Sequence, residues 1–183
     1  MYKGTNPIAL KSQQWLINSL LSLMKEQAYS HITIQAICKN ADLSRQTFYN
    51  FFETKDDILR CYIHNIYDNQ FKQFAVTPTM QETVEAIAQI INENKEILFN
   101  MIENNLESII TDEMVKCVGM FAERFILKSD DSDTFYYKVV LFSGALAHML
   151  VYWLRQDNPI STEELIMLLT DFLSGNLYEF GVQ

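Results

Sequence analysis

The chain has 183 residues, of which 49% are hydrophobic and only 5 are glycine and 3 proline, a balance that favours packed helices over turn-rich β architectures or disorder. No apolar run reaches the roughly 20 residues that a bilayer span needs, and the N-terminus lacks the apolar core of a signal peptide, so we expect a cytoplasmic protein with no membrane partner. The formal net charge of −9, taken alone, argues against nucleic-acid binding, because contacts to phosphates supply much of the affinity for DNA.

The charge is distributed unevenly along the chain. Residues 1–60 hold seven Lys and Arg against five Asp and Glu, which leaves +2, whereas the remainder holds seven against 18, which leaves −11. This asymmetry suits a DNA-binding N-terminal module on an acidic body, although a solvated acidic surface without that purpose produces the same pattern.

Helical spacing of apolar residues predicts three helices in the first 54 residues. The first runs from about residue 8 to residue 26. Thr33 is placed to cap a second, short helix, and Asp42 then interrupts the pattern because Asp favours turns and tolerates left-handed backbone. Ser44 caps a third helix, which we expect to run to about Phe52.

The rest of the chain continues as helices. A fourth helix is predicted over residues 55–74, Pro78 breaks the pattern, and Thr79 with Glu82 forms a capping-box sequence for the next helix. Further periodic stretches are residues 84–91, 97–102, 109–127 and 135–154, and Ser161 caps the last helix. We therefore expect an all-α protein of about nine helices, divided into a helix-turn-helix domain (1–54), a connecting helix (55–77) and a regulatory and dimerisation body (78–183).

The third predicted helix is dense in polar side chains. Phe48 and Phe51 anchor it to the core, and its two turns carry Arg45, Gln46, Thr47, Tyr49 and Asn50. A short helix, a tight turn and a second short helix with such a surface form the unit that places its second helix in a DNA major groove. Helical hairpins without this function are common, so the spacing alone is weak evidence.

Taken as a run, residues 33–59 resemble the signature of TetR-type transcriptional regulators, and the first helix extends the resemblance. Its most specific part is the Thr47-Phe48-Tyr49 run with Phe52, followed by the lysine that opens the fourth helix. The sequence departs from the family at Ala28 and Asp42, where the family often has glycine.

The resemblance implies roles for individual residues of the module. Arg45 and Gln35 would face base edges, where Arg suits guanine and amides suit adenine. The residues implied to hold phosphates are Thr33, Ser44, Thr47, Tyr49 and Lys55. Gln46 and Asn50 are further candidates for DNA contacts, and an ordinary solvated helix position is the alternative for each residue.

For the body, the resemblance implies a homodimer formed by the last two helices and a small-molecule cavity. Residues 142–147 offer small side chains that let two helices approach closely. Met and aromatic side chains make adaptable cavity walls, and the candidates for a hydrophobic effector are Phe99, Met101, Met114, Cys117, Phe121, Phe125, Tyr137 and His148. An ordinary core position is the alternative for each of them.

We expect no catalytic, metal or cofactor site. No nucleophile elbow, phosphate loop, zinc box or dinucleotide fingerprint has its required spacing, and His64 with Asp68, one turn apart, is too little for a metal. The sequence therefore predicts a TetR-type repressor that an effector releases from a palindromic operator of double-stranded DNA. The alternative is an adaptor of the same fold that works through a protein partner, as some family members that coactivate dihydroxyacetone kinase genes do.

Overall fold

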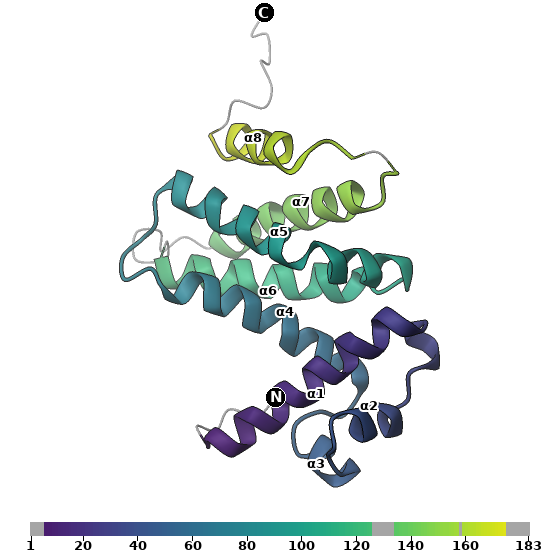
Figure 1. Ribbon diagram of the computed structural model, residues 1–183. Coiled ribbons are helices and arrows are strands. Elements are labelled where there is room, and N and C mark those ends of the chain that lie inside the picture. The colour runs from purple at the N-terminus through teal and green to yellow at the C-terminus, as the bar shows by residue number, and fades with distance from the viewer. Residues whose placement is uncertain (1–5, 126–133, 158, 175–183) are drawn as a thin grey trace, which may run out of the picture. The chain divides into compact units, whose positions relative to one another are not determined.

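The computed structural model describes residues 6–125, 134–157 and 159–174, and within them the chain forms eight α-helices and no strand (Figure 1). The helices are α1 (Pro7–Glu26), α2 (Ile34–Asn40), α3 (Arg45–Tyr49), α4 (Lys55–Lys72), α5 (Met80–Glu103), α6 (Glu107–Phe125), α7 (Phe135–Leu154) and α8 (Thr162–Leu173). A single 3₁₀ turn, η1 (Tyr29–His31), lies between α1 and α2. The prediction of an all-α fold is confirmed.

The chain divides into two compact units. The head unit comprises Met1–Asn65 and Ile97–Glu113, and the body unit comprises Ile66–Glu96 and Met114–Gln183. The division falls inside α4, α5 and α6, so these three helices contribute residues to both units. The domain boundaries predicted at residues 54 and 77 lie at breaks in the sequence pattern. In the structure the head unit also includes residues 97–113, which are distant in the sequence.

In the head, α1, α2 and α3 contact one another around a core that includes Leu16, Leu20, Ile37 and Phe48. The two helix caps that the sequence predicts in this unit are both present. Thr33 Oγ1 accepts a hydrogen bond from the Ala36 amide at 3.1 Å, and Ser44 Oγ accepts one from the Thr47 amide at 3.0 Å. Each cap satisfies an amide that would otherwise have no partner at a helix start.

The end of α5 and the start of α6 belong to the head because polar side chains bind them there. Asn100 Nδ2 donates to the Met24 carbonyl at 2.8 Å, near the C-terminus of α1, and the Tyr29 amide donates to Asn104 Oδ1 at 2.8 Å. Arg60 of α4 pairs with Asp112 and Glu113 of α6, each at 3.3 Å. These bonds link segments that are more than 50 residues apart in sequence.

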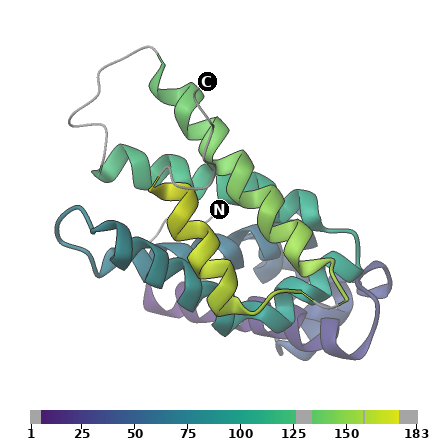
Figure 2. The same ribbon diagram turned by 90° about the horizontal axis from the view of Figure 1, so that it is seen from above.

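The body unit is built from parts of α4, α5 and α6 together with α7 and α8. In both ribbon views α8 lies beside α7 (Figures 1 and 2), and Phe142 stacks on Phe172 with ring centroids 5.8 Å apart. Leu146 of α7 and Leu169 of α8 are buried in one cluster with Val84 of α5. The capping boxes predicted at residues 79–82 and 161–164 are confirmed, with the amides of residues 82 and 164 donating to the cap hydroxyls at 3.2 and 3.1 Å.

Two predicted helix boundaries are wrong. The stretches at 84–91 and 97–102 belong to one helix, α5, because the intervening residues 92–96 are polar but include neither glycine nor proline. Within that stretch Asn94 Nδ2 donates to the Ile90 carbonyl at 2.7 Å, so the polar residues continue the helix. The third helix ends at Tyr49, three residues before the expected Phe52.

One described helix, α7, is long and apolar enough by length and composition to cross a bilayer. It is not an unbroken apolar run, because Lys138 and His148 interrupt it. A core helix passes the same test, and α7 contributes buried residues to two apolar clusters of the body.

Candidate nucleic-acid interface and body cavity

Helix α3 exposes one polar face and buries the other. Phe48 is 0% exposed, and Phe51 and Phe52 are buried as well, so aromatic side chains fix the helix to the head core. The opposite face carries four exposed side chains of the predicted contact set, namely Arg45, Gln46, Tyr49 and Asn50. Ser44 is exposed at the cap and Thr47 is half-buried, with their hydroxyl oxygens 2.8 Å apart.

Arg45 and Tyr49 act as a pair on this face. They lie one turn apart, and a hydrogen bond from the guanidinium to the Tyr49 hydroxyl raises the pKa of Arg45. Tyr49 is 51% exposed, and its ring meets Phe48 edge to face at 5.3 Å. The aromatic contact packs the tyrosine against the buried anchor, and Arg45, one turn away, remains exposed and charged.

Helix α2 adds Thr33 and Gln35, both exposed, to the same module. The turn between α2 and α3 contains Asp42 with φ of 52°, which is left-handed backbone. The expectation that aspartate tolerates this conformation in place of the family's glycine is therefore confirmed.

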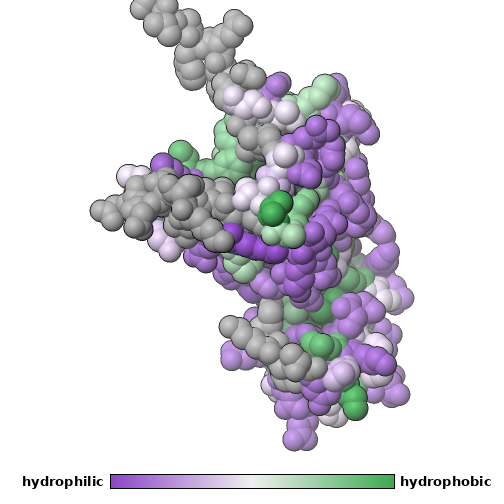
Figure 3. Space-filling model, turned by 90° about the vertical axis from the view of Figure 1, so that its left-hand side faces the viewer, coloured by the Kyte–Doolittle hydropathy of each residue, from purple (hydrophilic) through white to green (hydrophobic). Residues whose placement is uncertain are grey.

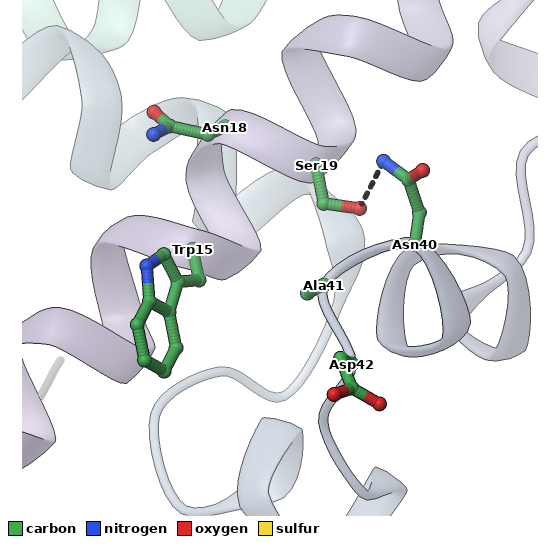
Figure 4. Close-up of a pocket in the computed structure, with 6 residues that line it drawn as sticks. All are labelled: Trp15, Asn18, Ser19, Asn40, Ala41 and Asp42. Carbon is green, nitrogen blue, oxygen red and sulfur yellow. Dashed lines mark hydrogen bonds between the residues drawn. The ribbon is translucent and has the colours of Figure 1, made fainter.

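A small polar cluster of Ser19 and Asn40 links α1 to the end of α2, next to this turn. Ser19 Oγ of α1 donates to the Ile37 carbonyl at 2.8 Å, and Asn40 Nδ2 donates to Ser19 Oγ at 3.1 Å (Figure 4). The Ile37 carbonyl, which also accepts from the Ala41 amide at 3.0 Å, thereby gains a second donor, and the cluster fixes α2 to α1. Beside it is a cleft of about 410 Å³ lined by Trp15, Asn18, Ser19, Asn40, Ala41 and Asp42 (Figure 4).

Lys55, a predicted phosphate contact, is only partly exposed and is bonded within the head. Its ammonium donates to the Tyr29 carbonyl and to the Ile32 carbonyl, the latter at 2.9 Å, and lies 4.0 Å from the centre of the Tyr29 ring. Burial lowers the pKa of Lys55, and the Asp56 carboxylate opposes that shift. Two of its three N–H groups are therefore occupied, which leaves one for another acceptor.

The sequence reasoning missed the residues that hold this module together. Ser19, Tyr29, Asn40, Asn100 and Asn104 carry its supporting hydrogen bonds. All of them join segments that are at least 18 residues apart, and helical periodicity reports only neighbours three or four residues apart.

The body unit contains an apolar cavity of about 430 Å³. Five rings line it, together with aliphatic and small residues of α5, α6 and α7; the rings are Tyr67, Phe71, Phe121, Phe135 and Phe142. Its polar or charged lining residues are Tyr67, Thr77, Thr83 and Lys138.

Of the eight predicted ligand residues, Phe121 is the one that lines this cavity. Cys117 is buried and Met114 is half-buried in the body, whereas Phe99 and Met101 belong to the head unit. Tyr137 and His148 are exposed on α7, where the His148 ring bonds the Gly144 carbonyl, so neither lines the cavity. The side chain of Phe125 lies outside the described part of the structure.

Apolar side chains are exposed along α7 and α8. On α7, Tyr137 and Leu141 are 79% and 77% exposed, and on α8 Met167 and Leu168 are also exposed. The two helices border a groove of about 790 Å³. The face drawn in Figure 3, by comparison, is mainly hydrophilic with small separate apolar patches.

Comparison with known protein families identifies both ends of the chain. Residues 16–61 match the family described as "Bacterial regulatory proteins, tetR family". Residues 78–175, more than half of the chain, match "Transcriptional regulator C-terminal region" of the same family.

Among curated proteins, the chain is similar to the HTH-type dhaKLM operon transcriptional activator DhaS of Lactococcus lactis subsp. lactis strain IL1403, at 31% identity over 62 residues, or 34% of this chain. The match spans about a third of that relative's length, 31%.

Three solved structures share this fold over most of their length. The dihydroxyacetone kinase operon activator DhaS matches with a TM-score of 0.61 at 20% identity, covering 91% of this chain and 96% of that one. A TetR transcriptional regulator from Streptococcus agalactiae 2603V gives 0.58 at 21% identity, covering 90% and 94%. The TetR family repressor AlkX from Dietzia sp. strain DQ12-45-1b gives 0.61 at 14% identity, covering 94% and 96%. The chain belongs to the TetR family and is a helix-turn-helix transcriptional regulator.

Proposed function

We propose that the chain binds a palindromic operator as a homodimer, with α3 of each protomer in the major groove of one half-site. The observation that carries this proposal is the exposed polar face of α3, where Arg45 and Tyr49 lie one turn apart beside the buried Phe48 anchor. In the proposed complex Arg45 and Gln35 read base edges. The phosphate contacts are Thr33, Ser44, Thr47, Tyr49 and Lys55, and Gln46 and Asn50 make further contacts.

The dimer is proposed to form through α7 and α8. Contiguous exposed apolar side chains on a helix surface are typical of interaction sites, and Tyr137, Leu141 and Tyr152 are more than two-thirds exposed along one side of α7. Gly144 lies between Leu141 and Tyr152, and a Cβ added there would meet nothing within 4 Å. That open space allows the backbone of a second helix to approach closely.

The body cavity is proposed to bind a small hydrophobic effector that releases the operator. Its volume of about 430 Å³ lies within the usual range for ligand sites, and apolar groups form most of its wall. Such an effector must favour the released state by about 1–3 kcal/mol to change operator affinity noticeably.

A second candidate function is transcriptional activation. The curated relative matched at 31% identity is an activator, whereas the similar AlkX structure is that of a repressor, so the direction of control does not follow from similarity. An adaptor that works only through a protein partner is less well supported, because the exposed Arg45 and Tyr49 retain the chemistry of DNA contact.

The decisive experiment is selection of bound DNA from a random pool at about 0.1 M salt, followed by transcription from a reporter that carries the selected site. The expected result is enrichment of a sequence with two inverted half-sites, bound by two protomers. Lower reporter output in the presence of the protein supports repression and higher output supports activation. A pool that stays random after repeated selection excludes the proposed operator binding.

A further inference from the structure

The walls of the body cavity offer flat aromatic surfaces. Tyr67 and Phe71 stack with ring centroids 4.8 Å apart, and Phe71 meets Phe121 edge to face at 5.1 Å. Phe142 lines another part of the wall. Ordered rings of this kind gain additional attraction from a ligand that is itself aromatic, and a rigid ligand loses less conformational freedom on binding than a flexible chain does.

The charge of the lining residues restricts which ligands can enter. None of the described residues that line the cavity is an aspartate or glutamate, and Lys138 is its one charged lining residue. A cationic ligand would lose its hydration there without gaining a carboxylate partner, which is strongly unfavourable. The cavity therefore disfavours cationic molecules.

Tyr67 provides one polar group for a ligand. Its hydroxyl has no hydrogen-bond partner among the residues that the structure describes. Burial raises the pKa of Tyr67, so the hydroxyl keeps its proton at neutral pH and can donate it. A ligand oxygen that accepts this hydrogen bond would satisfy a group that has no partner among the described residues.

We propose that the body cavity selects a flat aromatic molecule that is neutral or negatively charged and has an oxygen acceptor for the Tyr67 hydroxyl. Aromatic carboxylic acids and aromatic alcohols are the class that meets these conditions. The inference rests on the proposed function, in which this cavity binds the effector, and it specifies the chemistry of that effector.

Three probes with the same ring test the charge selection by titration calorimetry on the full chain without DNA. They are 2-naphthoate, 2-naphthalenemethanol and 2-naphthylmethylammonium. We expect the carboxylate and the alcohol to bind at least about tenfold more tightly than the ammonium. Comparable affinity for the ammonium, or binding of none of the three probes, would overturn the proposal.

Decanoate tests the shape selection. It should bind about threefold to tenfold more weakly than naphthoate, and tighter binding of decanoate would exclude a preference for flat rings.

The hydrogen bond is tested by Tyr67→Phe, which removes only the hydroxyl. The alcohol probe should lose about fivefold in affinity, whereas Tyr136→Phe, the same change at an exposed tyrosine outside the cavity, should leave it unchanged. Unchanged thermal unfolding of Tyr67→Phe would show that it folds normally, and unchanged probe affinity would then remove Tyr67 from the site. Operator binding is measured separately: probe binding that leaves the DNA complex intact supports the ligand class while contradicting effector release.

Discussion

At the scale of single residues, Lys55 shows how one side chain can serve the fold of a DNA-binding module. Its ammonium binds two carbonyls in the connection between α1 and α2 and lies over the Tyr29 ring. The Tyr29 hydroxyl donates a hydrogen bond to Asp56. The pKa of Tyr29 is raised, mainly by burial and also by this hydrogen bond. Lys55 and Asp56, at the start of α4, thus hold the segment that leads into α2.

We predict that Lys55→Met destabilises the head by about 1–3 kcal/mol, because two partly buried carbonyls lose a charged hydrogen-bond donor while the length of the side chain is kept. Urea unfolding measures the change. Lys39→Met, at an exposed lysine of α2, is the matched control and should change stability by less than about 0.5 kcal/mol. Equal effects of the two substitutions would show that the carbonyl contacts contribute nothing.

If Lys55 also contacts a phosphate through its remaining N–H, the same Lys55→Met variant should change the salt dependence of operator binding. The slope of the logarithm of the operator binding constant against the logarithm of salt concentration should fall by about 0.9 for each protomer. A stable variant with an unchanged slope would assign Lys55 to the fold alone.

Residues that act within one turn of helix could be predicted from the sequence. The hydroxyls of Thr33, Ser44 and Ser161 cap helices as expected, because a cap depends on amides two or three positions away. The position of the Lys55 ammonium could not be predicted, since its partners lie 23 and 26 residues earlier. The cavity lining was predicted least well, because Met and aromatic composition does not say which side of a helix faces a neighbour.

At the scale of elements, two asparagines at the C-terminal end of α5, Asn100 within the helix and Asn104 directly after it, complete the hydrogen bonding of the helix-turn-helix module. Asn100 bonds the Met24 carbonyl at the end of α1, and Asn104 accepts from the Tyr29 amide while donating to the Asn100 carbonyl at 2.8 Å. Asn105 then ends the helix with left-handed backbone, φ 58°, and the Leu106 amide donates to the Met101 carbonyl. The end of α5 is therefore part of the head, although its sequence lies far from the module.

We predict that Asn104→Ala lowers the free energy of unfolding of the head by about 1–3 kcal/mol, because the Tyr29 amide loses its acceptor in a partly buried site. Hydrogen exchange at the Tyr29 amide provides a local readout and should accelerate. Asn92→Ala, at an exposed position of α5, is the control. Similar exchange rates in both variants would mean that the α5 contact does not hold the connection between α1 and α2.

At the scale of the whole molecule, one side of α7 exposes apolar side chains that no other described residue of the chain covers. A twofold interface would bury Leu141 of both protomers, which is worth about 3–6 kcal/mol in total. We predict that Leu141→Glu shifts the protein to monomers at micromolar concentration. Val76→Glu introduces the same charge at a position with the same 77% exposure and should leave the oligomeric state unchanged. Sedimentation equilibrium distinguishes the two, and a wild type that is itself monomeric would refute the proposed dimer.

The claim that α3 reads bases in a major groove is tested most directly by one set of binding free energies. These are measured for the selected operator and its single-base-pair variants, with wild type, Arg45→Ala and the control Arg155→Ala, an exposed arginine of the body. We expect Arg45→Ala to lose about 1–3 kcal/mol of discrimination at one base pair of each half-site and Arg155→Ala to keep it. Full discrimination retained by Arg45→Ala at every position would show that Arg45 reads no base.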